Sequence, residues 1–345
     1  MSNPEVLGIL LTGKCNLVCR HCCNESHPLN NFVARIDDIR RLIDEAAEVG
    51  SIREVGFSGG EPFLFEALLL DAVAYAKARG YRSSITTNGY WGRSARGRRL
   101  VAALKDRGLT MLAISTSTFH REFVSVETVI AAAEAGLDAG LQVTINIVES
   151  AELKPVAVLA ELGGLADRVG YAVMPLLPVG RGAAQIAADQ LEPRFATPLG
   201  NCADYFQTLA VEVGGDVYPC CSAGGFTPPL RLGNVKDASI AAIVGNARRN
   251  RLISILHSVG PAFFLPFIRA AEADEDLPDR FIDQCHLCHA MLSSPRAAAV
   301  VEAAAAQLVG ELAMAGDDAI AVDDPLAAVL AARNAGAAAP SAVEV

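Results

Sequence analysis

The stretch TGKCNLVCRHCCNES, residues 12–26, places four cysteines within nine positions at the end of the apolar run LGILLTG, residues 7–13. A short apolar run of this kind is typical of a buried strand. In parallel α/β folds, functional residues lie just past the C-terminal ends of the strands. The stretch therefore predicts a first strand with a site at its end.

A repeat of about thirty residues extends from this stretch along the chain. Amphipathic runs with helical spacing each end at a glycine, and a short apolar or β-branched run follows. Such alternation predicts a parallel sheet with helices outside it, either a partial or full barrel or an open doubly wound sheet. The glycines are Gly50, Gly80, Gly108 and Gly140, and the runs are 52–58, 82–87, 111–116, 141–148 and 170–176.

Three further polar segments follow predicted strands. They are SGGEP (58–62), TNGYW (87–91) and STSTFH (115–120). Because the ends of parallel strands meet at one rim, we expect these segments to converge with the cysteines.

Composition narrows the function. The formal net charge of −10 argues against a nucleic-acid partner, since affinity for phosphates needs Lys and Arg. No apolar run is long enough for a membrane span, and residues 1–7 contain no secretion signal, so we expect a cytoplasmic protein. Nine cysteines in such a chain indicate metal or redox chemistry rather than disulfides.

The first cysteine group has the spacing Cys15-x3-Cys19-x2-Cys22. Structural zinc usually takes four ligands from two separated pairs, which this loop does not provide. Three thiolates from one loop suit a four-iron cubane with one iron open to a substrate or cofactor.

Together with Gly59-Gly60-Glu61-Pro62 after the second strand, this group resembles the radical S-adenosylmethionine (SAM) enzymes. The resemblance implies a partial (β/α)6 barrel that holds a [4Fe-4S] cluster on Cys15, Cys19 and Cys22. It further implies that SAM chelates the open iron. One electron, supplied by a flavodoxin or ferredoxin, then releases a 5′-deoxyadenosyl radical that takes hydrogen from a substrate.

The resemblance also implies a SAM site at the strand ends. The turn Gly59, Gly60, Glu61 and Pro62 would meet the SAM ammonium through backbone carbonyls and the Glu61 carboxylate. Each other candidate also has a structural reading, as a turn cap or as core filler. Many relatives carry an Asp where this chain has Ser117, which weakens the expectation of a ribose contact there. The other candidates are His21, Thr87, Asn88, Ser115, Asn146 and Met174.

Beyond residue 195 the repeat stops and cysteines return. Two β-rich runs around Gly214-Gly215 predict a hairpin that delivers Cys220. By spacing alone, Cys202, Cys220, Cys285 and Cys288 could hold zinc or an iron–sulfur cluster, and zinc is the better fit to the spacing.

With PVGRG (178–182) before them, these cysteines resemble the SPASM and twitch extensions of radical SAM enzymes. This implies one auxiliary [4Fe-4S] cluster on Cys202, Cys220, Cys285 and Cys288. Cys23 and Cys221 remain, and we interpret Cys23 as a bystander. By resemblance to radical peptide epimerases, Cys221 is a candidate hydrogen-atom donor.

These patterns divide the chain into a barrel (1–195), a small α+β auxiliary-cluster domain (196–295) and an Ala-rich helix with a disordered tail (296–345). A helical insertion is expected at 257–283. The first function we expect is modification of a ribosomally made peptide by epimerisation, crosslinking or oxidation. Because the chain starts at its first strand, we expect no N-terminal leader-binding domain. Either a separate protein would supply one, or the mouth of the barrel would bind the peptide alone. The alternatives are a radical SAM dehydrogenase of sugars or cyclitols and a zinc-stabilised binding protein without turnover.

Overall fold

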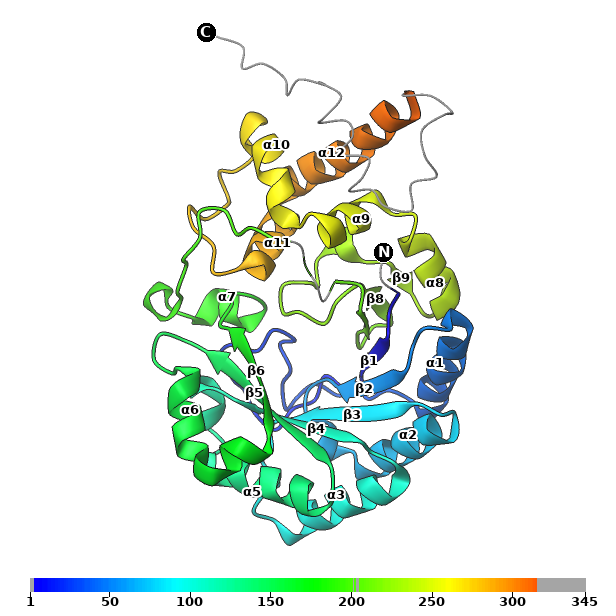
Figure 1. The fold of residues 1–345 in the computed structure, drawn as a ribbon, viewed down its shortest axis with the longest axis vertical. Coiled ribbons are helices and arrows are strands. Elements are labelled where there is room, and N and C mark those ends of the chain that lie inside the picture. Colours follow the sequence, from blue (N-terminus) through cyan, green and yellow to red (C-terminus); the bar gives the residue numbers. More distant parts are fainter. Residues whose placement is uncertain (1–2, 201, 203–204, 315–345) are drawn as a thin grey trace.

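The computed structural model describes residues 3–200, 202 and 205–314. Its sheet has the strand order β6-β5-β4-β3-β2-β1-β7-β8-β9, and the first six strands are all parallel (Figure 1). The six are β1 (Val6–Leu10), β2 (Glu54–Ser58), β3 (Arg82–Thr87), β4 (Met111–Thr116), β5 (Gln142–Glu149) and β6 (Gly170–Pro175).

Helices connect these strands and cover the outer face of the curved sheet (Figure 1). The predicted glycine stops are present: Gly50 and Gly108 end their helices with φ of 75° and 109°, in the left-handed region. The expected partial barrel is therefore confirmed. The helices are α1 (Ile36–Val49), α2 (Glu66–Ala78), α3 (Ala95–Arg107), the short α4 (Thr118–Arg121), α5 (Val126–Asp138), α6 (Pro155–Leu162) and the short α7 (Arg181–Gln185).

The two faces of the barrel sheet differ in side-chain type. Residues that point to the helices are large and fully buried, as Val55, Phe57 and Ile85 are. Several residues that point inward are small or polar, among them two pairs that the register aligns, Gly8 with Gly56 and Ser115 with Asn146. The core therefore lies between sheet and helices, and the inner face carries the groups suited to a site.

The second half of the chain extends the same sheet. Strand β7 (Thr208–Val211) pairs in parallel with β1, and β8 (Asp216–Tyr218) and β9 (Gly233–Asn234) follow antiparallel. The predicted hairpin around Gly214-Gly215 is confirmed, with Gly215 at φ 93° in its turn. Because β7 pairs with β1, the two halves share one sheet.

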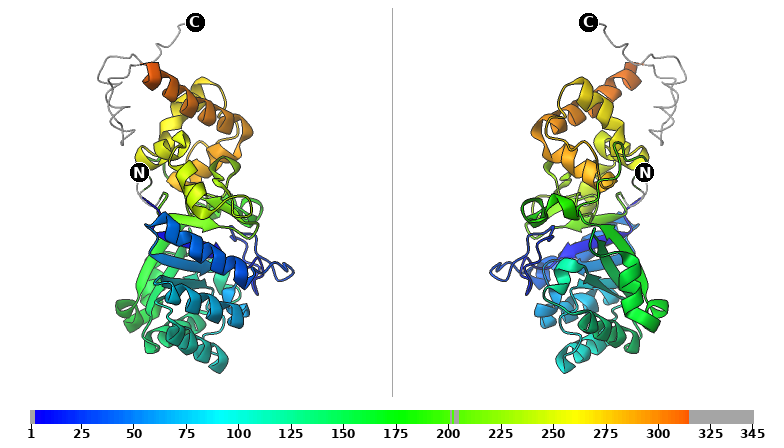
Figure 2. Two further views of the ribbon diagram at one scale, coloured as in Figure 1. Left: turned by 90° about the vertical axis from the view of Figure 1, so that its right-hand side faces the viewer. Right: turned by 90° about the vertical axis from the view of Figure 1, so that its left-hand side faces the viewer.

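The C-terminal helices gather at one end of the molecule, above the barrel in Figure 1 and Figure 2. Helix α12 packs against α9, α10 and α11, so it joins the second half instead of standing apart. The predicted C-terminal helix is present, and the tail expected beyond it lies outside the described residues. The helices are α8 (Ile240–Ala247), α9 (Arg251–Ser258), α10 (Leu265–Ala270), α11 (Gln284–Ser293) and α12 (Pro295–Met314).

Within the part of the chain that the structure describes, no single helix is long and apolar enough to cross a membrane. One pair of segments, Arg251–Ser258 and Pro261–Ala270, meets the length and composition together but is bent by 115°. Leu252, Ile253 and Ile268 of this pair are buried in the protein core.

Candidate functional site

The loop that follows β1 carries the first three cysteines across the C-terminal rim of the barrel. The Sγ atom of Cys15 accepts hydrogen bonds from the backbone N–H of Leu17 at 3.4 Å and from Asn88 Nδ2 at 3.8 Å. Burial raises the pKa of Cys15 to about 11 and that of Cys19 to about 12. Such thiols ionise when a metal takes the place of the proton, and N–H donors to sulfur stabilise the resulting thiolate.

Arg181 clamps this loop from the PVGRG segment. Its guanidinium donates to the carbonyl oxygens of Cys19 at 2.8 Å and Ser26 at 2.6 Å, and its backbone N–H donates to that of Cys22 at 3.1 Å. Gly180 has φ 54°, and a Cβ there would lie 2.4 Å from the Cys23 carbonyl oxygen. The motif was visible in the sequence, but its role as a clamp on the cysteine loop was not.

The GGEP turn lies directly on the start of the same loop. The backbone N–H groups of Gly60 and Glu61 donate to the carbonyl oxygens of Thr12 at 2.6 Å and Lys14 at 2.8 Å. A Cβ on Gly60 would lie 2.1 Å from the Lys14 oxygen, so only glycine allows this approach. The sequence expectation that these two segments converge is met by direct contact.

The Glu61 carboxylate lies fully buried between the ends of β2 and β3. It accepts hydrogen bonds from Thr87 Oγ1 at 2.8 Å, from Asn88 N at 2.8 Å and from Phe63 N at 3.0 Å. Burial raises its pKa to about 7, and these three bonds oppose the rise.

Thr87 takes a different place from the one expected of a ribose contact. Besides donating to Glu61, its hydroxyl accepts from the indole N–H of Trp91 and the backbone N–H of Gly89, both at 3.1 Å. With its side chain 2% exposed, Thr87 fixes the third strand end rather than facing the inner surface.

A ring cluster joins the cysteine loop to the segment after β4. The His21 ring stacks on Phe119 at 5.0 Å between centroids and meets the edge of His120 at 4.7 Å. Ser117 caps α4, and its hydroxyl lies 2.8 Å from His120 Nδ1. The serine at this position therefore stabilises the start of α4 and the position of the His120 ring. Burial lowers the pKa of His21 to about 3, and His21 Nδ1 has no hydrogen-bond partner among the described residues.

The remaining strand candidates share the inner face. Ser115 and Asn146 are direct neighbours across β4 and β5. Met174 pairs with Val148, two residues beyond Asn146, so it lies on the same face, with 41% of its surface exposed.

Pro62 begins a short 3-10 helix (Pro62–Leu64) and is buried. Asn88 instead points toward the cysteine loop, where it contacts Cys15 and Asn16.

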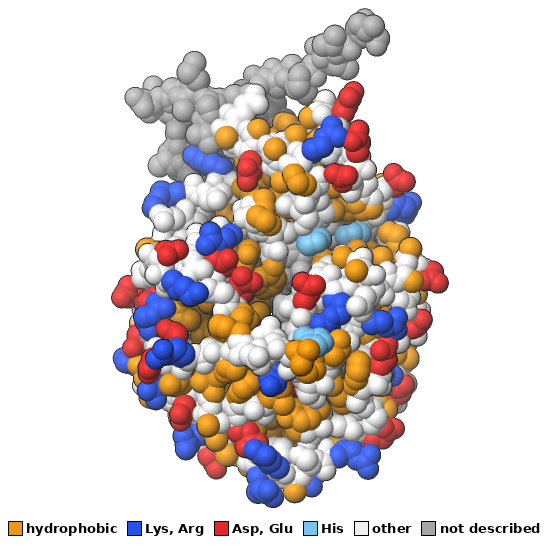
Figure 3. All heavy atoms as spheres, turned by 180° about the vertical axis from the view of Figure 1, so that it is seen from behind, with side chains coloured by type: hydrophobic (Ala, Val, Ile, Leu, Met, Phe, Trp, Pro, Cys, Tyr) orange, Lys and Arg blue, Asp and Glu red, His pale blue; other side chains and the backbone are white. Residues whose placement is uncertain are grey.

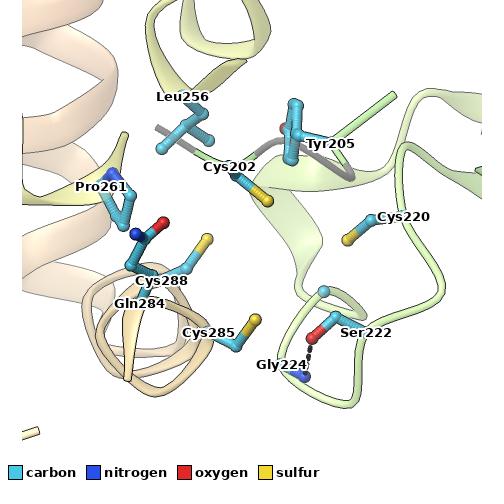
Figure 4. Close-up of a pocket in the computed structure, with 11 residues that line it drawn as sticks. Cys202, Tyr205, Cys220, Ser222, Gly224, Leu256, Pro261, Gln284, Cys285 and Cys288 are labelled. Atoms are coloured by element: carbon cyan, nitrogen blue, oxygen red, sulfur yellow. Dashed lines mark hydrogen bonds between the residues drawn. The ribbon is translucent and has the colours of Figure 1, made fainter. Parts of the chain in front are cut away.

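The second cysteine group lines one cavity of about 380 Å³, which includes its open mouth. Figure 4 shows the four sulfurs turned toward a common space. Cys220 follows β8, whereas Cys285 and Cys288 lie in the first turns of α11, where Asp283 caps the helix by accepting from His286 N at 2.8 Å. The residues around this space are Cys202, Tyr205, Cys220, Ser222, Gly224, Gly225, Leu256, Pro261, Gln284, Cys285 and Cys288.

Two features of this cavity fit an iron–sulfur group. A Cβ on Gly225 would lie 2.3 Å from Cys220 Sγ, and one on Gly224 would lie 2.5 Å from the Cys285 carbonyl oxygen, so the glycines form a cradle beside the thiols. The Tyr205 hydroxyl is buried without a partner among the described residues. Across the described ranges, no three His, Cys, Asp or Glu side chains gather around a point suited to a single metal ion.

The two remaining cysteines are both exposed to solvent. The pKa of Cys23 is nevertheless raised to about 12. Burial is the main cause, Cys22 adds to the rise, and Cys221 contributes least.

Comparison with known families matches both halves of the chain. The Radical SAM superfamily matches residues 9–148, and the iron–sulfur cluster-binding domain called SPASM matches residues 202–289. These ranges contain the two cysteine groups described above.

Individual proteins are similar over different lengths. A candidate peptide biosynthesis protein, YydG of Bacillus subtilis (strain 168), is 24% identical over 299 residues, which cover 84% of this chain and 92% of that protein. A GTP 3′,8-cyclase of Synechococcus sp. (strain CC9902) is 37% identical over 112 residues, which cover 31% of this chain and 32% of the cyclase.

Among solved structures, the one titled native anSMEcpe with bound AdoMet and Cp18Cys peptide has a similar fold. Its TM-score is 0.52 at 15% identity, with 87% of this chain and 99% of that chain covered.

Proposed function

This chain belongs to the radical SAM superfamily and carries an iron–sulfur SPASM domain, and from this premise we propose that it removes a hydrogen atom from a ribosomally made peptide. The observation that carries the proposal is the similarity to YydG, named for peptide biosynthesis, because it spans both halves of the chain. The cyclase similarity is confined to about a third of the chain and supports only the shared chemistry.

Within the radical SAM domain, Cys15, Cys19 and Cys22 would hold the [4Fe-4S] cluster. When bound, the cluster and SAM supply the 5′-deoxyadenosyl radical. The Glu61 side chain is already committed to Thr87 and Asn88, so the contact to the SAM ammonium falls to the carbonyls of the Gly59–Gly60 turn.

Other residues would line the SAM pocket. His21 presents a buried ring nitrogen without a partner among the described residues, suited to an adenine edge. Ser115, Asn146 and Met174 share the inner face of the sheet, where a ribose and adenine would lie.

The second group, Cys202, Cys220, Cys285 and Cys288, would hold one auxiliary [4Fe-4S] cluster. Four thiols fill all four ligand positions of a cubane, so this cluster keeps no iron open and suits electron transfer. A flavodoxin or ferredoxin would supply the electrons.

The edge strand β6 supports an extended peptide as the substrate. Leu176 N donates to the Glu149 oxygen, so the ladder directs the backbone groups of Tyr171 and Val173 away from β5, toward the open edge. These two side chains are 55% and 44% exposed. Backbone pairing along such an edge binds a peptide strand without demanding one sequence. Figure 3 shows one face of the molecule hollowed between the barrel and the C-terminal part, with hydrophobic side chains at the border.

Cys221 makes epimerisation the reaction we favour. An α-carbon that has lost its hydrogen atom to the deoxyadenosyl radical would take another from the Cys221 S–H on the opposite face. The resulting thiyl would need one electron and one proton, supplied by the reductant and solvent. Cys221 is exposed and follows Cys220, which would be a ligand of the auxiliary cluster, so an electron source would lie nearby.

The experiment is co-expression with each short peptide encoded beside the gene, in deuterated medium, followed by mass spectrometry and chiral analysis of the hydrolysate. The proposal expects one deuterium at one α-carbon and a D-residue with the wild type. Cys221→Ala should still form 5′-deoxyadenosine but yield no D-residue. A desaturated or crosslinked peptide would remove Cys221 from the mechanism, and turnover of sugars or cyclitols alone would contradict a peptide substrate.

A further inference from the structure

Tyr205 lies at the auxiliary cavity with its side chain 2% exposed. Its hydroxyl oxygen is fully buried and makes no hydrogen bond within the described part of the chain. A buried hydroxyl without a partner costs on the order of 1–3 kcal/mol. A phenylalanine would avoid that cost. Tyr205 is one of the residues that line the cavity, so a group bound there is the candidate partner for its hydroxyl.

The backbone holds Tyr205 in this position. Its N–H donates to the Cys202 oxygen at 3.2 Å, which makes it part of the turn that carries that cysteine. The next residue, Phe206, is fully buried, adopts φ 64° and donates its N–H to the Pro219 oxygen at 2.8 Å, next to Cys220. A left-handed backbone at a bulky residue is strained and persists only where its surroundings fix it. The phenol is therefore held between the segments of two ligand cysteines, as Figure 4 shows.

We infer that Tyr205 donates its hydroxyl hydrogen to a sulfur of the auxiliary iron–sulfur group and thereby raises the reduction potential of that group. The inference rests on the proposed function for the four ligands. The cavity is lined by cysteine thiols, and sulfur is the acceptor that a filled cavity would offer to a phenol. A donor to cluster sulfur favours the reduced state, because that state carries more negative charge.

The test compares anaerobically reconstituted wild-type enzyme with Tyr205→Phe and with Tyr218→Phe as the matched control. Tyr218 is a second buried tyrosine of the same half, packed on Phe226 and outside the cavity lining. Each protein is titrated electrochemically with detection by electron paramagnetic resonance. We expect Tyr205→Phe to keep its iron and to lower the potential of the auxiliary cluster. The potential of the first cluster in the same molecule, and both potentials in Tyr218→Phe, should not move.

A structural role would give a different pattern. An unchanged auxiliary potential in Tyr205→Phe, or loss of the auxiliary iron from that variant alone, would overturn the inference while leaving the ligand set intact. Wild-type enzyme that binds no auxiliary iron would instead overturn the proposed function.

Thermal unfolding gives a second readout that a packing role would not produce. Tyr205→Phe should make the apo protein at least as stable as the wild type, since it removes the cost of a buried hydroxyl without a partner, but should lower the unfolding temperature of the holo protein. Equal effects on both forms would contradict a bond to the bound group.

Discussion

Glu61 is a carboxylate with no exposed surface, held by donors from Phe63, Thr87 and Asn88. Its pKa in the folded protein is about 7, above the ordinary value of 4.5, because burial outweighs those donors. The folded state therefore binds this proton more tightly than the unfolded state does. Stability from this group is present below pH 4.5 and is lost as the pH rises to about 7.

We therefore predict that the free energy of unfolding of the apo protein falls by about 3 kcal/mol from this group between those two pH values. Glu61→Gln, which cannot ionise, should remove that slope even if it lowers stability at every pH. Denaturant titrations at several pH values measure both. Parallel pH profiles for the two proteins would contradict a raised pKa at Glu61.

Residues differ in how far the sequence alone predicts them. Cys15, Cys19 and Cys22 could be proposed as ligands because their spacing sits within one loop and belongs to a family pattern. The contacts of Glu61 with Thr87, and of Asn88 with Cys15, join segments 26 and 73 residues apart. A polar residue at a strand end gives the same sequence signal whether it binds a ligand or forms a hydrogen bond to a neighbouring strand end. The sequence alone therefore could not predict these contacts.

At the scale of elements, the glycine-rich turn after β8 is expected to matter for the auxiliary cluster as much as the cysteine ligands beside it. Gly225→Ala would place a methyl group 2.3 Å from Cys220 Sγ, so either the turn or the sulfur must move. We predict that this variant loses most of the iron of the auxiliary cluster and keeps that of the first. Iron and sulfide analysis measures the loss.

Gly214→Ala is the control for this change. It lies in the neighbouring hairpin, its nearest neighbour would be at an ordinary 3.6 Å, and its φ is not positive. If both variants keep a full complement of iron, the turn does not determine the position of Cys220.

The open edge of β6 makes a separate prediction. Val173→Pro removes a backbone N–H that points away from β5, and edge strands tolerate such a proline. We predict that Val173→Pro folds like the wild type but loses affinity for peptides that the wild type selects from a displayed random library. Ala172→Pro, which removes a bond to β5, should lower stability instead. Equal retention of those peptides by Val173→Pro would exclude pairing at this edge.

Elements were the level at which sequence patterns were most informative. Helical periodicity and glycine stops located the helices of the barrel, because amphipathic faces and left-handed caps are local properties. The pairing of β7 with β1 has no local signal, since a strand's partner is chosen by tertiary packing.

At the scale of the whole molecule, that pairing joins the two halves. β7 covers one edge of β1, and Glu45 of α1 accepts from Ile240 N at 2.9 Å at the start of α8. The boundary predicted at residue 195 separates the first cysteine group from the second. The sheet, however, is continuous across the two halves. The two cysteine groups therefore lie on segments that extend from one continuous sheet.

The central claim is that one chain holds two iron–sulfur clusters with separate tasks. The measurement that tests it most directly is iron and sulfide per chain, together with 5′-deoxyadenosine formed under reductant. It compares the wild type with Cys15→Ala/Cys19→Ala/Cys22→Ala and with Cys202→Ala/Cys220→Ala. We predict about eight irons in the wild type and about four in each variant, with SAM cleavage abolished only in the first. Zinc in place of iron, or a wild type that leaves SAM intact, would contradict the account.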